Sequence, residues 1–228
     1  MPDGDSVPLS PPRSDRFCEK RTAKSDKRYD VPMAEVTAFV LAGGLSSRMG
    51  SDKALLSLGD QTLLERTLAT ASAVTNKVCI VGPKERYAEI GEVVEDIHPG
   101  CGPLGGIHAA LATTETDQNL MLSVDMPLMT AQFLRWLLER ANAASELIVV
   151  PEAAGGTQPL CAVYCRAVRD AAEHALKRGE YKIGRLFSQV PTRIIAEQEI
   201  VANSFSTEIF QNVNTPEELR KCRAQNQV

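Results

Sequence analysis

The sequence predicts an α/β protein with a doubly wound, mostly parallel sheet in a three-layer α/β/α arrangement. Short apolar runs alternate along the chain with helix-length amphipathic stretches, which is the rhythm of successive strand–helix units. The first run, residues 39–42, is apolar without alternation, as expected for an inner parallel strand covered on both faces. With 228 residues and 43% hydrophobic composition, the chain can bury such a core in one domain.

The chain divides into two parts by composition. Residues 1–34 contain repeated prolines among Ser, Asp, Arg and Lys, and such a segment buries too little apolar surface to offset its ordering entropy. We therefore expect a disordered polar extension over 1–34 and a single folded domain over 35–228. Met33 lies just before the first strand, and a start of translation at Met33 is a further hypothesis.

The elements expected in the first half of the chain follow from apolar runs and a helix cap. Thr62 and Glu65 have the spacing of a capping box, and the leucines after Thr62 recur at helical spacing. The expected elements are, in order, a strand at 39–42, a short strand and turn at 54–60, a helix from 63, strands at 78–82 and 93–94, a helix over 107–111 and a strand at 120–124.

In the second half the rhythm changes. Pro159 lies near the beginning of an expected strand, where a missing N–H does least harm. Thr215-Pro-Glu-Glu has the form of a helix start, with Thr as N-cap, Pro at the first position and acids in the first turn. The expected elements are a helix over 133–144, strands at 147–150 and 158–164, helices over 168–177 and 183–186, brief strands at 194–195 and 209–210, and a helix from 216.

Charge and cysteine content argue against several classes of protein. With a net charge of −4, the chain lacks the excess of basic residues that is typical of a nucleic-acid-binding domain. No apolar run approaches the roughly 20 residues of a transmembrane helix, and the N-terminus lacks the apolar region of a secretory signal. The six cysteines form no C-x-x-C pair, so we expect free thiols in a reduced, cytoplasmic protein rather than a zinc site.

The stretch after the first strand has the composition of a phosphate-binding loop. Gly43 and Gly44 have no Cβ, so backbone N–H groups can come close to a ligand. Arg48 and Lys53 add cations, and Gly50 keeps the loop tight. The P-loop pattern is not met, because Gly50 is followed by Ser-Asp-Lys, and the G-x-G-x-x-G fingerprint is not met either.

Two aspartates follow expected strands. Asp125 comes after the strand at 120–124, at the strand end where open α/β sheets bind their ligands. If that strand neighbours the first one, Asp125 can hold Mg²⁺ on a polyphosphate, because magnesium favours one or two carboxylates with phosphate oxygens and water. From spacing alone, Asp125 as a simple turn cap is the open alternative. Asp96 precedes Gly-Pro-Leu-Gly-Gly, a helix start that could meet an anion or a base edge.

Residues 41–53 read L-A-G-G-x-S-x-R-M-G-x-D-K, which resembles the signature of the nucleotidyltransferases that guanylylate molybdenum cofactor. The D-x(5)-G-P-L-x-G block at Asp96, the D-x-P element at Asp125, Gln158-Pro159 and the N-x-N-T-P segment from Asn212 resemble that family in the same order. The resemblance implies a Rossmann-like nucleotide-diphospho transferase fold. It also implies Mg²⁺-dependent transfer of GMP from GTP to molybdenum-molybdopterin, with release of pyrophosphate.

The resemblance further implies roles for single residues. Arg48 and Lys53 would hold the leaving phosphates, and Asp125 would be the metal ligand as well as a catalytic residue. One element is not carried over: many members have an Asn after the second strand, where this chain has Val81-Gly82-Pro83. The nucleotide-binding positions matched are Leu41, Ala42, Gly43, Gly44, Lys53, Asp96 and Asp125.

Several alternatives stay open at this point. A CTP-dependent relative usually has Ala in place of Gly43; another nucleotidyltransferase with a phosphorylated acceptor, and a non-catalytic nucleotide-binding module, are the other possibilities. The expected partners are GTP, the molybdopterin cofactor and molybdoenzymes or their chaperones, without nucleic acid or membrane. Arg166, Lys182 and Arg185 are candidates for the pterin phosphate, although a solvated helix face explains them equally well.

Overall fold

The structure is a computed structural model that describes residues 35–43 and 52–225. These described residues belong to one compact unit. The predicted disorder of residues 1–34 lies outside the described residues, as do Gly44 and Arg48 of the glycine-rich loop.

The described residues form one large sheet, which confirms the predicted fold class. Its strands are β1 (Val36–Leu41), β4 (Lys77–Val81), β5 (Val93–Val94), β6 (Gln118–Ser123), β7 (Ile148–Ala153), β8 (Gly156–Thr157), β9 (Cys161–Cys165) and β10 (Thr192–Ile195). The strand order is β10-β7-β9-β6-β1-β4-β5, with β8 paired to β7. β1 runs parallel to both of its neighbours, β4 and β6, whereas β9 runs antiparallel to β6 and β7. The sheet is therefore mostly parallel with one reversed inner strand.

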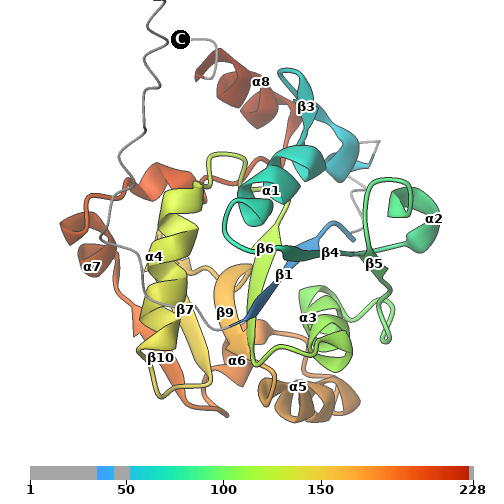
Figure 1. Ribbon diagram of the computed structural model, residues 1–228, viewed down its shortest axis with the longest axis vertical. Helices are drawn as coiled ribbons and strands as arrows, with labels where there is room; N and C mark the ends of the chain where they lie inside the picture. The colour runs from blue at the N-terminus through green and yellow to red at the C-terminus, as the bar shows by residue number, and fades with distance from the viewer. Residues whose placement is uncertain (1–34, 44–51, 226–228) are drawn as a thin grey trace, which may run out of the picture. The chain divides into compact units, whose positions relative to one another are not determined.

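Helices cover both faces of this sheet (Figure 1). They are α1 (Leu63–Ser72), α2 (Lys84–Tyr87), α3 (Pro103–Thr113), α4 (Ala131–Asn142), α5 (Val168–Lys177), α6 (Ile183–Leu186), α7 (Glu197–Ala202) and α8 (Pro216–Gln225), with 3-10 turns η2 (Lys53–Leu55) and η3 (Thr207–Phe210). A small hairpin, β2 (Ser57–Leu58) and β3 (Gln61–Thr62), precedes α1.

Two apolar clusters show why β1 is apolar without alternation. Ala38 and Val40 pack in one cluster with α1, α4, α7 and α8, and Phe39 and Leu41 pack in the other with α3, α5 and α6. Successive side chains of a strand point to opposite faces, so a strand with helices on both sides has to be apolar at every position. The predicted three-layer arrangement is confirmed.

Local signals in the sequence account for several helix boundaries. The Thr62 side chain accepts from the Glu65 N–H at 3.1 Å, and the Glu65 carboxylate accepts from the Thr62 N–H at 2.7 Å, so the predicted capping box is present. The helix expected over 107–111 begins earlier, at Pro103, directly after Gly102. Gly102 has φ of +66°, a conformation that glycine adopts without steric cost.

Some predicted strands are wrong in type or extent. Ile209 and Phe210 belong to η3, and both are buried in the core; the Phe210 ring lies 5.2 Å from the ring of Phe133. A short apolar pair marks burial but does not distinguish a strand from a helical turn. The strand expected from 158 begins at Cys161, and the segment expected as strand from 54 begins with η2 instead.

None of the described helices combines the length and the apolar character that crossing a bilayer requires.

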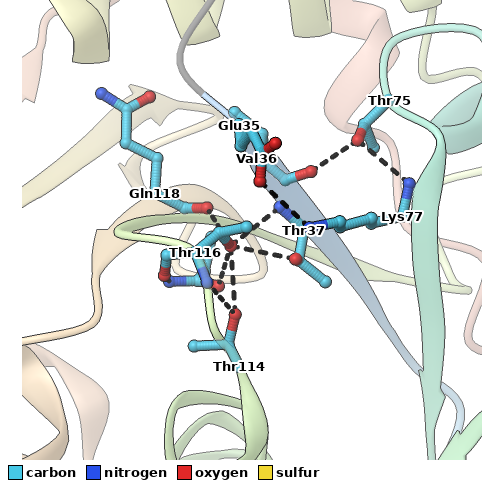
Figure 2. Close-up of polar contacts among 9 residues, drawn as sticks. Glu35, Val36, Thr37, Thr75, Lys77, Thr114, Thr116 and Gln118 are labelled. Atoms are coloured by element: carbon cyan, nitrogen blue, oxygen red, sulfur yellow. Dashed lines mark hydrogen bonds and ion pairs between the residues drawn. The ribbon is translucent and has the colours of Figure 1, made fainter.

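A buried polar network joins β1 to β6 at the amino ends of these strands (Figure 2). The Thr116 hydroxyl accepts from the Thr37 N–H at 3.2 Å and lies 2.9 Å from the Thr37 hydroxyl and 3.0 Å from that of Thr114. It also lies 3.1 Å from the amide oxygen of Asn119, which is fully buried. Buried polar groups are stable when each finds a partner, and this network supplies those partners.

Thr116→Val keeps the shape of the side chain but leaves the Thr37 N–H and the Asn119 amide without their hydroxyl partner. We expect the free energy of unfolding, measured by urea denaturation, to fall by about 1–3 kcal/mol. Thr113→Val is the matched control, because that threonine is exposed on α3 and bonds only within its own helix. Its effect should stay within about 0.5 kcal/mol; equal losses in the two variants would contradict the role given to the network.

Candidate functional site

The site lies where the order of the strands reverses. From β1 the chain continues outward through β4 and β5 on one side, and then returns to β6 on the other side. β1 and β6 are parallel neighbours, so their carboxyl ends open at the same edge, which is where open α/β sheets bind ligands. β1 leads into Ala42 and Gly43, and β6 leads into Asp125. The condition on which a role for Asp125 depends, that these two strands are neighbours, is met.

Lys53, Asp125 and Asn214 meet at this edge, although they are far apart in the chain. The Lys53 ammonium lies 3.3 Å from Oδ2 of Asp125 and 2.8 Å from Oδ1 of Asn214. The Lys53 and Asp125 side chains are 14% and 25% exposed, so the pair is partly shielded from water while the carboxylate stays accessible. Lys53 follows directly on Asp52, whose carboxylate caps η2 by accepting from the Ala54 N–H at 3.1 Å.

The segment before α8 is fixed to Asp125 through the backbone. The Val213 N–H donates to the Asp125 carbonyl at 2.8 Å. The Glu218 carboxylate then accepts from the N–H groups of Asn214 (2.6 Å) and Thr215 (3.0 Å), while the Thr215 hydroxyl accepts from the Glu218 N–H. The hydrogen bond from the Asn214 N–H, and after it those from Thr215, hold the pKa of the Glu218 carboxyl below its usual value. Sequence reasoning counted Glu218 among the acids of the first helical turn but did not identify its capping-box role, which the Thr-x-x-Glu spacing indicates.

The turn after Asp125 is held by α1. Met126 is buried, and the Arg66 side chain donates from Nε to the Pro127 carbonyl at 2.8 Å. The aspartate therefore stands on a turn that is anchored from both the core and the neighbouring helix.

The first residues of the glycine-rich loop are bonded to the end of β4. The N–H groups of Ala42 and Gly43 both donate to the Val81 carbonyl, at 3.0 and 3.1 Å. A Cβ at Gly43 would lie 3.4 Å from the Cα of Gly82, so the two chain segments approach closely here. The start of the glycine-rich loop, residues 41–43, is thus fixed against the end of β4.

Asp96 lies at the carboxyl end of β5 and packs on the first turn of α3. Its Oδ1 accepts from the His98 N–H at 2.8 Å. A Cβ built on Gly105 would lie 2.9 Å from both carboxylate oxygens of Asp96 and 3.0 Å from the His98 carbonyl. The absence of a Cβ at Gly105 is therefore what allows Asp96 to pack against the start of α3.

Arg166, one candidate for the pterin phosphate, lies at the wrong edge of the sheet. It follows β9, whose last residue pairs with Gln118 at the amino end of β6, and its N–H donates to the Asp117 carbonyl. β9 runs antiparallel to β6, which puts Arg166 opposite the edge that carries Asp125. Arg185 faces Glu180 at 3.9 Å on the surface, as a solvated residue does.

Gly105→Ala is expected to destabilise the protein, because the new methyl would overlap both carboxylate oxygens of Asp96. In an open helix the same substitution stabilises by up to about 1 kcal/mol through helix propensity. Gly184→Ala in α6 is the matched control, since nothing lies within 4 Å of its added Cβ. Thermal unfolding should therefore shift downward for Gly105→Ala and stay level or rise for Gly184→Ala; a rise in both would show that Asp96 does not pack on Gly105.

Comparison with known proteins decides the family. A model of the MobA-like NTP transferase domain matches residues 38–194. The chain belongs to the MobA-like NTP transferase family. The match runs from β1 to β10 and so includes the strand edge that carries Asp125.

Individual relatives of this family member agree with that assignment. A protein from Pelotomaculum thermopropionicum named "Probable molybdenum cofactor guanylyltransferase" is 34% identical over 193 residues, which cover 84% of this chain and 93% of the relative. The crystal structure of molybdopterin-guanine dinucleotide biosynthesis protein A from Archaeoglobus fulgidus has a TM-score of 0.74 and 25% identity, covering 84% of this chain and 98% of that one. A 2-C-methyl-D-erythritol 4-phosphate cytidylyltransferase from Thermus thermophilus shares the fold, with a TM-score of 0.64 and 20% identity over 85% of this chain and all of that one.

Proposed function

We propose that the protein transfers the GMP moiety of GTP to molybdenum-molybdopterin, giving the molybdopterin guanine dinucleotide form of the cofactor and pyrophosphate. The observation that carries this proposal is the meeting of Lys53 with Asp125 at the carboxyl ends of two parallel strands, in a member of the MobA-like NTP transferase family. The lysine comes from the glycine-rich signature and the aspartate from the D-x-P element. The relatives named as guanylyltransferases favour GTP as the donor.

The chemistry asks little of the protein beyond alignment and charge neutralisation. The acceptor phosphate is already an anionic nucleophile, so its attack on the α-phosphorus needs no general base. As the bond between the α-phosphorus and the bridging oxygen breaks, negative charge grows on the pyrophosphate. Lys53 is proposed to bind these leaving oxygens, and the resemblance implies the same role for Arg48.

Asp125 is proposed to hold Mg²⁺. Its carboxylate is partly exposed, and within the described ranges no three His, Cys, Asp or Glu side chains gather into a group that could enclose an ion. A single carboxylate suits magnesium in sites where the substrate phosphates and water complete the coordination shell. When bound, the ion would neutralise charge on the phosphate oxygens. Lys53 keeps a second contact to Asn214, so it need not lose all its partners when Asp125 binds a cation.

The remaining nucleotide-binding positions are proposed on the family pattern. Leu41, Ala42, Gly43 and Gly44 would border the nucleotide on the β1 side, and Asp96 would contact it from the start of α3. Molybdoenzymes or their chaperones are the proposed recipients of the product, and the cytoplasm, which supplies GTP, is the proposed compartment.

A CTP-dependent activity is the second candidate, because the cytidylyltransferase from Thermus thermophilus has the same fold. The deciding measurement is pyrophosphate release with Mg²⁺ and molybdenum-loaded molybdopterin, with GTP, CTP and ATP compared side by side. We expect release with GTP, and none above background with the other two. Release with CTP alone would assign the protein to the cytidylyl activity.

Lys53→Ala and Asp125→Ala should each lower kcat for pyrophosphate release by roughly a hundredfold or more, the size seen when one group that stabilises developing charge is removed. Asp125→Ala should still bind nucleotide, because Lys53 and the loop are kept. The matched controls are Lys77→Ala and Asp170→Ala, since both residues form exposed surface ion pairs, with Glu35 and Arg169 respectively. Loss of turnover in the controls as well would mean that the effect is not specific to the site.

A further inference from the structure

The hydroxyl of Tyr87 lies between the two chain segments that flank the glycine-rich loop. Its oxygen is 3.2 Å from the Ala42 carbonyl, just after β1, and 2.8 Å from Oδ2 of Asp52, just before η2. The Arg86 guanidinium also reaches Oδ2 of Asp52, at 3.2 Å. Tyr87 is 1% exposed, so this hydroxyl is not shared with bulk water.

Gly82 makes room for the ring of Tyr87. A Cβ at residue 82 would lie 2.8 Å from Cε2 and 3.1 Å from Cδ2 of that ring, closer than side-chain atoms approach one another. A side chain at residue 82 and the ring of Tyr87 in its present position therefore exclude each other.

Asp52 links this hydroxyl to Lys53. One carboxylate oxygen of Asp52 faces Tyr87, and the other accepts from the Ala54 N–H and so fixes the start of η2. Lys53 is the first residue of η2, and its ammonium reaches Asp125 and Asn214. Contacts therefore run without a break from Tyr87 through Asp52 to the proposed phosphate-binding lysine.

We propose that Tyr87 is a positioning residue: its hydroxyl holds Asp52 against the end of β1 and thereby aims Lys53 at the phosphates of the nucleotide. This inference rests on the proposed function and deepens it. Burial, and then the bond to Asp52, raise the pKa of Tyr87 well above its usual value, so the hydroxyl remains a neutral donor at any pH at which the enzyme works.

The test is Tyr87→Phe, which keeps the ring beside Gly82 and removes only the hydroxyl. We expect kcat/KM for GTP to fall roughly tenfold, because misplacement of a positioned group by a fraction of an ångström lowers the rate. The KM for GTP should rise and the KM for molybdenum-loaded molybdopterin should not change, because Lys53 meets only the nucleotide. A smaller folded fraction would instead lower the apparent kcat and leave both KM values as they are.

Thr75→Val is the matched control. Thr75 also donates a hydroxyl hydrogen bond to a carbonyl of β1, that of Val36, but at the amino end of the strand (Figure 2). The Thr75→Val variant should be less stable than the unmodified protein, with neither KM value changed. A double-mutant cycle with Asp52→Ala tests the route: if the hydroxyl acts through Asp52, adding Tyr87→Phe to Asp52→Ala lowers kcat/KM no further.

Unchanged kinetics with GTP in Tyr87→Phe, or losses that add in the double variant, would overturn the positioning role and leave the proposed function intact. Turnover of CTP in place of GTP by the unmodified protein would overturn the proposed function only, and the same Tyr87→Phe comparison would then be made with CTP. A protein that neither binds nor turns over any of the nucleotides overturns both.

Discussion

The whole structure depends on the position of β1 between two parallel neighbours. It hydrogen-bonds to β4 on one edge and β6 on the other, and it buries side chains against helices on both faces. A strand that is paired at both edges and buried on both faces has little freedom to shift in register, because a slip by one residue would exchange the side chains of its two faces. Ala42 and Gly43 therefore leave the sheet at a fixed point, beside the end of β6 and Asp125. The geometry of the site follows from this constraint before any ligand is bound.

The parts that sequence could predict are those set by local chemistry. The apolar run of β1, the capping box of Thr62 and Glu65 and the strand before Asp125 each depend on neighbouring residues, and the structure confirms them. The reversal of β9 could not be predicted, because direction is decided by the path of the chain between strands rather than by the composition of the strand. For the same reason the sequence did not show that Arg166, a candidate for the pterin phosphate, lies at the edge opposite Asp125.

The contact between Lys53 and Asn214 shows a second limit of sequence reasoning. Taken alone, Asn212-Val-Asn-Thr-Pro is equally typical of turn and cap chemistry, and part of it does cap α8. Only the folded chain shows that Asn214 also reaches the lysine, whereas Asn212 is simply exposed. A motif can thus hold one residue for structure and its neighbour for the site. The spacing of the motif does not show which residue has which role.

The two ends of β1 are built for different purposes. At the amino end, the Thr37, Thr114 and Thr116 hydroxyls satisfy one another in a dry interior, where partners cannot be exchanged without loss of stability. At the carboxyl end, Lys53 and Asp125 form a partly exposed ion pair, and such pairs contribute little net stability. Their mutual contact can therefore be given up for ligand oxygens at small cost. The same strand thus has a buried hydrogen-bond network at one end and a partly exposed ion pair near the other.

Lys53 and Asn214 are separated by 161 positions, and this separation has a consequence for biosynthesis. A chain emerges from the ribosome with its N-terminal part first. The glycine-rich loop, β1, β6 and Asp125 are all made well before the residue that completes the contacts of the lysine. A chain made only as far as Asp125 therefore lacks the Asn214 partner of Lys53. The contacts of the lysine become complete only after the segment before α8 has been made and has folded against Asp125.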